Sequence, residues 1–414
     1  MAFAKDVGKV FFPLDEELAL LPGTLTPHGH ETLVRLSSWM PFAKAAQILA
    51  DVMGIQVSKS LSQRYTEAAG AAYEELQNKA VEEIEREMPA VEAAGTERMQ
   101  ISADGAMVPL LHGVWAEVRT LVVGEILPVD EKRSAERGHA RNLSYFSRKV
   151  RAEEFQRLAL VEMYRRGVEK AKEVAAVMDG ASWEQGFIDY HCPNAVRILD
   201  FPHAAEHINQ VGEFVHGEKS ETSRAWLKER LHTLKHEGPE ELLLEIQEYQ
   251  KKYPQTEILS SNLAYLEKRK AQMQYPCFRA QGWPIGSGIV ESGNKLVVEA
   301  RLKGAGMHWA GKNVNPMLSL RNIICSDRWQ EEWPKIELRL RQQNRGHKKR
   351  LPQTKTPVFT IVDPVTHPKL DDKFIQTLAA SVQQQENSDK PKKNPWRNFK
   401  HGKALYQPSD PPKI

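Results

Sequence analysis

Three acidic residues, far apart along the chain, stand at positions where a carboxylate could take part in chemistry. Asp104 and Asp179 each follow a short run of strand-forming residues and precede a glycine, in "MQISADG" and "VAAVMDG". Glu291 follows a glycine-rich turn at the start of a helical pattern, in "WPIGSGIVESGNK". Because sites in α/β proteins form at the carboxyl ends of strands, two aspartates on neighbouring strands can converge there, and a glutamate from a covering helix can join them.

Carboxylate oxygens gathered in this way favour one kind of chemistry. Three hard oxygen ligands without a soft ligand nearby suit Mg²⁺ or Mn²⁺ rather than Zn²⁺. Two such ions about 4 Å apart can clamp the attacking and the leaving oxygen of a phosphodiester. Each Asp-Gly pair by itself is equally a turn after a strand, and spacing alone leaves both interpretations open. The hypothesis is a two-metal site whose catalytic and metal-binding residues are Asp104, Asp179 and Glu291.

The elements that must position these acids alternate between strands and helices. Strand patterns cover "RMQISADGAMVPL" and "WAEVRTLVVGEILPV", and the basic stretch 132–151 leaves room for a third strand. A helix at 153–172, a strand ending in Asp179, a short helix and a strand ending in Asp200 follow. This order predicts an α/β fold in which helices pack on a mixed sheet.

The remaining regions differ in character from the sheet. Residues 205–275 contain amphipathic helical patterns and no strand signal, and a structureless loop of that length is improbable, so a helical insertion is expected. The C-terminal region is rich in Lys and Arg, and its end has a disordered composition. The predicted divisions are an N-terminal helical region 1–92, the first part of the core 93–204, the insertion 205–275, the second part of the core 276–330, and a basic, partly disordered tail 331–414.

The N-terminal region contains a helix-turn-helix pattern. Residues 42–53 carry apolar side chains at helical spacing, Gly54 interrupts them, and a second helix starts near Ser60, with Gln63 completing a capping box. The second helix of such a motif reads base edges, which predicts DNA contacts by Gln63 and Arg64. An ordinary helical hairpin explains the same pattern, since two helices around a glycine are common.

Several stretches together resemble the ISKra family of bacterial insertion-sequence transposases: "ISADGAMV", "VMDGASW", "ILDFPHAAEHI", and "GWPIGSGIVESGNKLV" followed by "RLKGAGMHW". The resemblance covers roughly residues 95–330 and is most specific over 282–310. These transposases are DDE enzymes with a ribonuclease-H-like core. The resemblance implies that Asp104 and Asp179 are the first two acids and Glu291 the third, with two Mg²⁺ or Mn²⁺ ions as cofactors.

The same resemblance implies supporting residues and shows one departure. Asp200 and His203 match a D-x-x-H pair that follows the second aspartate in related groups, and the helical stretch after Asp200 is similar to their insertion domain. Many DDE enzymes carry a basic residue seven positions after the glutamate, where this chain has Val298. Lys295 and Arg301 are the nearest basic residues on that helix.

Other motifs have competing explanations. "HAAEH", residues 203–207, fits the H-x-x-E-H pattern of zinc proteases, but no third ligand is evident. His203 instead orients a metal ligand, contacts the scissile phosphate, or is simply buried. Lys295, Arg301 and Lys303 either face DNA phosphates or form a solvated face. Trp309 either stacks on a base or packs in the core.

Bulk composition constrains the surroundings in which the protein works. The 414 residues contain no window of 18 apolar residues, so no membrane interaction is expected. The three cysteines are far apart and form no CxxC pair, which fits a reducing cytoplasm. Net charge is only +3, so bulk charge does not by itself imply nucleic acid. The expected location is cytoplasmic, in a bacterium, and associated with the nucleoid.

The expected function is that of an insertion-sequence transposase. Metal-activated water would cut DNA at the element end, and the freed 3′-hydroxyl would attack target DNA. The partners would be terminal inverted repeats and target DNA, and joining two ends calls for a homodimer or larger assembly. A ribonuclease-H-like nuclease without strand joining and a non-catalytic DNA-binding protein are the alternatives.

Overall fold

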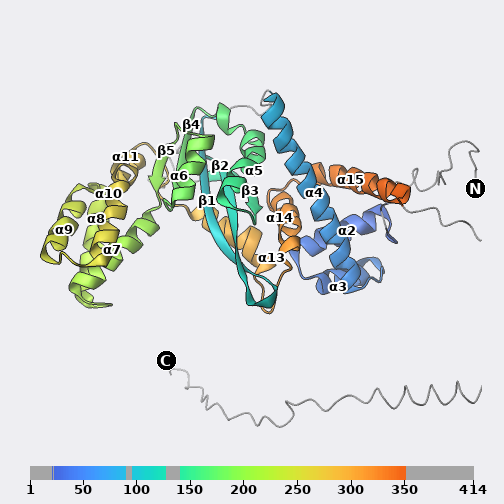
Figure 1. Ribbon diagram of the computed structural model, residues 1–414, viewed down its shortest axis with the longest axis horizontal. Coiled ribbons are helices and arrows are strands. Elements are labelled where there is room, and N and C mark those ends of the chain that lie inside the picture. Colours follow the sequence, from blue (N-terminus) through green and yellow to red (C-terminus); the bar gives the residue numbers. More distant parts are fainter. Residues whose placement is uncertain (1–20, 22, 90–95, 127–139, 351–414) are drawn as a thin grey trace, which may run out of the picture. The chain divides into compact units, whose positions relative to one another are not determined.

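A mixed five-stranded sheet lies at the centre of the computed structural model, which describes residues 21, 23–89, 96–126 and 140–350 (Figure 1). The strand order is β3-β2-β1-β4-β5. The first three strands pair antiparallel, and β1, β4 and β5 pair parallel. The bounds are β1 Arg98–Pro109, β2 Trp115–Ile126, β3 Ala140–Arg148, β4 Glu173–Met178 and β5 Val196–Leu199. The described residues therefore have an α/β fold, as predicted, and the third strand is present.

Helices cover both faces of this sheet, which explains why its strands read as apolar runs. On one face, Ile101 and Phe146 pack with Phe155 of α5 (Ala152–Arg165) and Phe187 of α6 (Ser182–His191). The other face is covered by a cluster that includes Val122, Val297 and Leu318. Its helices are α12 (Gly288–Gly293), a π-helical turn Asn294–Glu299, α13 (Ala300–Leu302) and α14 (Gly311–Cys325).

The stretch between β5 and α12 is helical, in agreement with the pattern at 205–275. Four long helices pack side by side around a core that includes Leu234, Ile246 and Leu266 (Figure 1). The helical stretch begins at Phe201, since Asp200 caps its first helix and Pro202 occupies the first turn. The helices are α7 Phe201–His216, α8 Glu221–His236, α9 Glu240–Lys252, α10 Glu257–Lys268 and the short α11 Tyr275–Ala280.

The N-terminal helices share one core with the C-terminal ones. Leu33, Leu49 and Tyr65 pack against Leu320 and Trp333. The helices are α2 Pro27–Trp39, α3 Phe42–Met53, α4 Lys59–Glu87 and α15 Trp329–Arg350.

The predicted start of a basic tail at residue 331 falls inside a packed helix. Arg339 of α15 donates from Nε to Glu75 Oε2 of α4 at 3.0 Å. The rest of the predicted tail, 351–414, lies outside the described residues.

Candidate active site

Asp104 and Asp179 occupy equivalent positions on neighbouring parallel strands. β1 and β4 pair from Arg98–Glu173 to Ile101–Ala176. Asp104 and Asp179 each follow the last paired residue of their strand by three positions. Asp104 does not end its strand, because β1 continues to Pro109 while paired with β2, in agreement with the strand pattern over 98–110. The acids therefore lie where β4 ends, beyond which β1 continues paired with β2 only on its other side.

Asp200 continues this row on the next strand. β4 and β5 pair up to Met178–Leu199, so Asp179 and Asp200 are the next residues of their strands. Oδ2 of Asp200 accepts from the His203 amide at 3.1 Å, which caps α7, and Oδ1 accepts from the Ser287 amide at 2.6 Å. Asp200 is buried, and burial raises the pKa of its carboxyl. Its observed contacts hold the glycine-rich turn in front of α12 against the start of α7.

The Asp104 carboxylate is half-buried and held at both oxygens. Oδ1 accepts from the Gly105 amide at 2.6 Å, and Oδ2 accepts from Nδ2 of Asn294 at 2.9 Å. Burial raises the pKa of Asp104 above its ordinary value, and the negative charge of Asp179 raises it further. Two carboxylates that repel each other in a partly buried place are stabilised by a cation between them. This is the electrostatic environment that a divalent metal ion would relieve.

Helix α10 holds the turn that carries Asp179. The Tyr265 hydroxyl donates to the Asp179 carbonyl, and Arg269 Nε donates to the Gly180 carbonyl at 3.0 Å. Gly180 has a φ of 82°, and a Cβ there would lie 2.3 Å from Arg269 Nε. Glycine is therefore required at this position both for its backbone angle and for the close approach of Arg269. Within the turn itself, the Ala181 amide donates to Asp179 Oδ1 at 2.7 Å.

Glu184 is a fourth acid at this place, and the sequence reasoning missed it. Its side chain is fully buried in the first turn of α6, and Oε2 accepts from the Gly180 amide at 2.9 Å. Burial raises the pKa of Glu184 to about 11, and the neighbouring Asp179 carboxylate contributes to the shift. Glu184 therefore remains protonated at neutral pH. A signal was available, since a glutamate at the third position of a helix commonly reaches back to the preceding backbone.

Glu291 does not lie with the two aspartates in this structure. Its side chain is 67% exposed and accepts from Lys295 Nζ at 2.5 Å. Across the described ranges, no group of three or more His, Cys, Asp or Glu side chains has the geometry to hold a metal ion. The expected convergence is thus met by Asp104 and Asp179 only, and the third carboxylate is turned toward its helical neighbour.

The backbone of Glu291 nonetheless stands close to the acid pair. Asn294, whose amide contacts Asp104, follows Glu291 by three residues on a continuous helical backbone. Residues three apart on a helix are neighbours, with Cβ atoms roughly 5–6 Å apart. A side-chain rotation away from Lys295 is therefore the movement that would bring a third carboxylate toward Asp104. Asp104 and Asp179 supply the hard oxygen donors that Mg²⁺ or Mn²⁺ prefers.

Arg301 and Trp309, for which DNA contact was one of two interpretations, are both buried, and for Trp309 this is the alternative of core packing. The Arg301 side chain is 2% exposed, donates from Nε to the Ser37 carbonyl at 2.8 Å and lies over the rings of Phe42 and Trp309. Burial lowers the pKa of Arg301 to about 10. Trp309 is 6% exposed and donates from Nε1 to the Leu302 carbonyl at 3.1 Å. A planar guanidinium packs well between aromatic faces, so both side chains join α13 to the N-terminal helices rather than to a substrate.

The two lysines predicted to contact phosphates are on the surface but already paired. Lys295 pairs with Glu291, and Lys303 Nζ lies 2.8 Å from Glu299 Oε1, also four residues away. Exposed pairs of this kind contribute little to stability and separate easily. Both ammonium groups therefore stay accessible to an anion.

The helix-turn-helix residues are only partly presented to solvent. Gly54 ends α3 with a φ of 68°, as predicted, but α4 is capped by Ser58 rather than Ser60, with the Leu61 amide donating to its hydroxyl at 3.1 Å. Gln63 donates to Glu67 Oε1 at 2.8 Å, whereas the Arg64 side chain is exposed. α4 has 29 residues, so it is the long central helix of the N-terminal bundle. DNA contact by Gln63 and Arg64 stays a prediction.

The two histidines of the "HAAEH" motif make contacts within the helical stretch. His207 stacks on Tyr265 with ring centroids 3.8 Å apart, and its Nδ1 lies 2.6 Å from Asn262 Oδ1. His203 Nδ1 lies 3.5 Å from Glu206 Oε2. These contacts place His203 and His207 beside Tyr265, whose hydroxyl reaches the Asp179 carbonyl.

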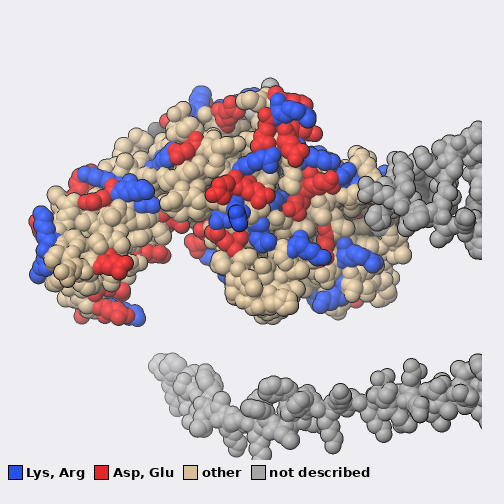
Figure 2. Space-filling view, in the orientation of Figure 1, with Lys and Arg blue, Asp and Glu red and all other residues tan. Residues whose placement is uncertain are grey.

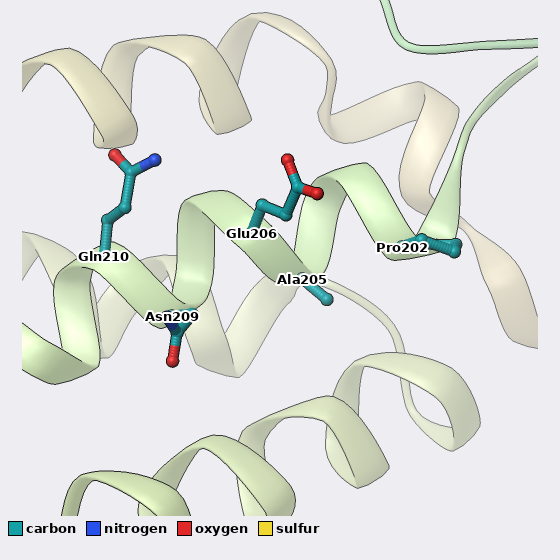
Figure 3. A pocket seen from close by; sticks show the side chains of 5 residues that line it. All are labelled: Pro202, Ala205, Glu206, Asn209 and Gln210. Atoms are coloured by element: carbon teal, nitrogen blue, oxygen red, sulfur yellow. The ribbon is translucent and has the colours of Figure 1, made fainter. Parts of the chain in front are cut away.

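A cavity of about 410 Å³ follows α7, and none of the three predicted catalytic acids lines it (Figure 3). Glu206 and Gln210 extend from one side of the helix, and Ala205 and Asn209 from the other. Pro202 completes the lining. The lining contains one carboxylate and neither histidine, so nothing in it favours the zinc-protease interpretation.

Comparison with known proteins assigns no family to the chain. No protein-family model and no curated protein sequence matches it. Within the described residues, no helix combines the length and the apolar character that crossing a bilayer requires. Any functional conclusion must therefore rest on the geometry of the acid pair and the elements around it.

Proposed function

We propose that the protein is a DDE-type transposase with a ribonuclease-H-like core, which cuts DNA at element ends and joins them to target DNA by divalent-metal-dependent phosphoryl transfer. The observation that supports the proposal is the position of Asp104 and Asp179, each three residues beyond the last paired residues of the parallel strands β1 and β4 and near enough for their charges to interact. The mixed five-stranded sheet with helices on both faces supports such a core. The resemblance of its motifs to ISKra-family transposases adds the third acid, Glu291.

The chain's own residues have distinct parts in this mechanism. When bound, a pair of divalent ions would supply an activated water and stabilise the charge that develops on the phosphate. Asp104 and Asp179 would hold the ions, and Asn294 orients the Asp104 carboxylate through its amide. Tyr265 and Arg269 fix the turn of Asp179 from the side of α10. Glu291 would complete the ligands after leaving Lys295.

The partners follow from the reaction. The substrates would be the terminal inverted repeats and target DNA, and joining two ends calls for a homodimer or a larger assembly on DNA, associated with the nucleoid. On the face shown in Figure 2, Lys and Arg are mixed with Asp and Glu rather than forming one uniformly basic surface. Binding would therefore depend on local groups of cations more than on the net charge.

One observation favours a second candidate, a DNA-binding protein without catalysis. The ion pair between Glu291 and Lys295 leaves the third proposed metal ligand away from Asp104 and Asp179. A nuclease that hydrolyses without joining would use the same acids as the transposase, and only the products separate those two.

The test is an assay with purified chain, Mg²⁺ and labelled duplex DNA from either side of the coding region. The transposase predicts hydrolysed ends followed by joined products, both lost in Asp104→Asn and Asp179→Asn. Asp189→Asn is the matched control, because Asp189 is an exposed acid on α6 paired only with Arg197. Hydrolysis without joining would favour the nuclease. If the wild type binds the DNA specifically but does not cleave it, the result would favour a DNA-binding protein without catalysis.

A further inference from the structure

The hairpin that joins β1 to β2 presents apolar side chains to solvent. Trp115 is 53% exposed, and Met107, Leu111 and Val114 are exposed around it. The reversal is tight, with positive φ at His112 and Gly113 and a 2.7 Å bond from the Leu110 amide to the Val114 carbonyl. An exposed indole among aliphatic side chains is a common mark of a binding surface.

One face of this hairpin leads from Trp115 into a cavity. Trp115, Glu117 and Arg119 alternate along β2 and so share a face, with Met107 opposite Glu117 on β1. The cavity beside them has a volume of about 480 Å³. It is lined by Glu117, Arg119, Lys149, Val150, Arg151, Ala152 and Glu153, and together with Trp115 we call it the hairpin groove.

The cations of the hairpin groove favour an anionic occupant. Arg119 Nη2 lies 2.5 Å from Glu117 Oε2, so these two charges compensate each other. Neither Lys149 nor Arg151 forms an ion pair within the part of the chain that the structure describes. Two uncompensated cations therefore remain in the groove against the single free carboxylate of Glu153.

The hairpin groove contacts residues that follow the two aspartates in the chain. The Glu117 side chain lies against Gly105, the residue after Asp104. A Cβ placed on Gly105 would lie 2.4 Å from Oε1 of Glu117. At the other end, the Arg119 guanidinium carbon lies 5.3 Å from the ring centre of Trp183, in the helix that follows Asp179. The Asp104 side chain itself points to the opposite face of the sheet, toward Asn294, so an occupant of the groove would lie across β1 from this carboxylate.

We infer that the hairpin groove binds a single-stranded stretch of DNA. Lys149 and Arg151 contact backbone phosphates, and Trp115 stacks on a base. The combination of an exposed indole with two unpaired cations favours this occupant. A protein that binds single-stranded DNA uses cations to contact phosphates and aromatic side chains to stack on bases. The identity of the occupant rests on the proposed function, but its binding does not require the acids to hold metal.

The test measures binding without catalysis. Fluorescence anisotropy with a labelled single-stranded oligonucleotide, in EDTA, gives Kd for each variant. Trp115→Ala should weaken binding about 5- to 150-fold, and Trp115→Phe should retain most of the affinity. In Lys149→Ala/Arg151→Ala, the slope of log Kd against log salt should fall by about 1.4, roughly 0.7 for each phosphate contact.

Matched controls come from elsewhere on the surface. Tyr190 is 50% exposed on α6, and Lys228 and Lys251 are exposed cations of α8 and α9. Tyr190→Ala and Lys228→Ala/Lys251→Ala should bind as the wild type does. Thermal melts of all variants establish that any loss of affinity is not a loss of folding.

The outcomes separate this inference from the proposed function. Wild-type affinity and salt slope in both groove variants would overturn the inference. A second result would also overturn the inference: Trp115→Ala changes the sedimentation coefficient, and hence the oligomeric state, without changing DNA affinity. A second copy of the chain would then be the occupant of the surface. Asp104→Asn should bind the oligonucleotide normally and fail to cleave. Groove-dependent binding by a wild type that never cleaves DNA would keep the inference and refute the transposase.

Discussion

The side-chain amide of Asn294 donates a hydrogen bond to Oδ2 of Asp104 at 2.9 Å, across 190 positions of the sequence. This bond joins the helical segment that carries Glu291 to the strand that carries the first aspartate. It also explains how a half-buried carboxylate keeps its orientation beside a second one. The contact makes Asn294 a positioning residue of the candidate site.

Asn294→Ala should weaken both the fold and the site. Asn294 is buried, and losing a buried hydrogen bond to a carboxylate costs about 1–3 kcal/mol of unfolding free energy. Cleavage should fall by at least about tenfold, because the Asp104 carboxylate is then free to rotate. Urea unfolding and the cleavage assay measure the two effects. Asn262→Ala, a buried asparagine of the insertion, is the control for stability, and an Asn294→Ala protein that cleaves normally would contradict the positioning role.

Glu184 predicts an unusual dependence of stability on pH. Its pKa is about 11 in the folded chain, against an ordinary value of about 4.3, so folding takes up a proton between these two values. The contribution of Glu184 to the free energy of unfolding is therefore fully present below about pH 4.3. It declines as pH rises, by at most about 1.4 kcal/mol per pH unit.

Glu184→Gln tests that dependence, since glutamine keeps the shape of the protonated acid and takes up no proton. Urea unfolding between pH 5 and 9 should show a shallower decline for the variant, which should be more stable than the wild type at pH 8. Glu154→Gln, an exposed residue of α5, should leave the profile unchanged. Parallel profiles for Glu184→Gln and the wild type would show that Glu184 is ionised in the folded chain.

Local patterns predicted much of the sheet but not the surroundings of the acids. The strand runs around Asp104 and Asp179 are short and apolar, and their parallel pairing put the two residues together. The strand pattern over 98–110 predicted that β1 continues beyond Asp104, and pairing with β2 accompanies that continuation. Trp309 and Arg301 were predicted to face DNA, yet their burial is decided by Phe42 and Ser37, more than 250 residues earlier in the chain.

The acidic side chains show the same limit at shorter range. Glu184 reads as an ordinary glutamate in a first helical turn, and only the fold shows that it is enclosed beside Asp179. Glu291 was expected to turn inward, but Lys295 one turn later offers a partner at the surface. Sequence spacing predicts which helix or strand carries a side chain. The direction in which that side chain points depends on the partners that the fold places around it.

The clamp of α10 on the Asp179 turn predicts that the helical insertion controls the second acid. Tyr265→Phe removes the hydroxyl that donates to the Asp179 carbonyl and should cost about 1 kcal/mol of stability. Cleavage should fall more than DNA binding does, since the turn holds a metal ligand in the proposed mechanism. Tyr253→Phe, in the same helical region but with its ring packed against Phe214, should behave as the wild type does.

Gly180→Ala should be more damaging than Tyr265→Phe. A Cβ at φ 82° is strained, and it would meet Arg269 Nε at 2.3 Å. The variant should lose about 2 kcal/mol or more of unfolding free energy, measured by urea unfolding. Gly54→Ala is the control that isolates the clash, since Gly54 also has a positive φ but no neighbour within 4 Å of its Cβ position. Equal losses in the two variants would show that Arg269 does not press on the turn.

The ion pair between Glu291 and Lys295 provides the decisive comparison for the proposed site. Both side chains are about two-thirds exposed, so breaking the pair should leave Tm unchanged within about 1 °C. If Glu291 completes a metal site, Mg²⁺ should raise the Tm of the wild type, because an ion that binds only the folded chain stabilises it, by about 2.7 kcal/mol at 100 times its Kd. Lys295→Ala should then need less Mg²⁺ for the same rise, since its carboxylate is already free. Glu291→Gln should show a smaller rise and no cleavage, while Glu299→Gln, which breaks the similar pair with Lys303, should match the wild type. An Mg²⁺ response in Glu291→Gln equal to that of the wild type would remove Glu291 from the ligands, and with it the DDE assignment.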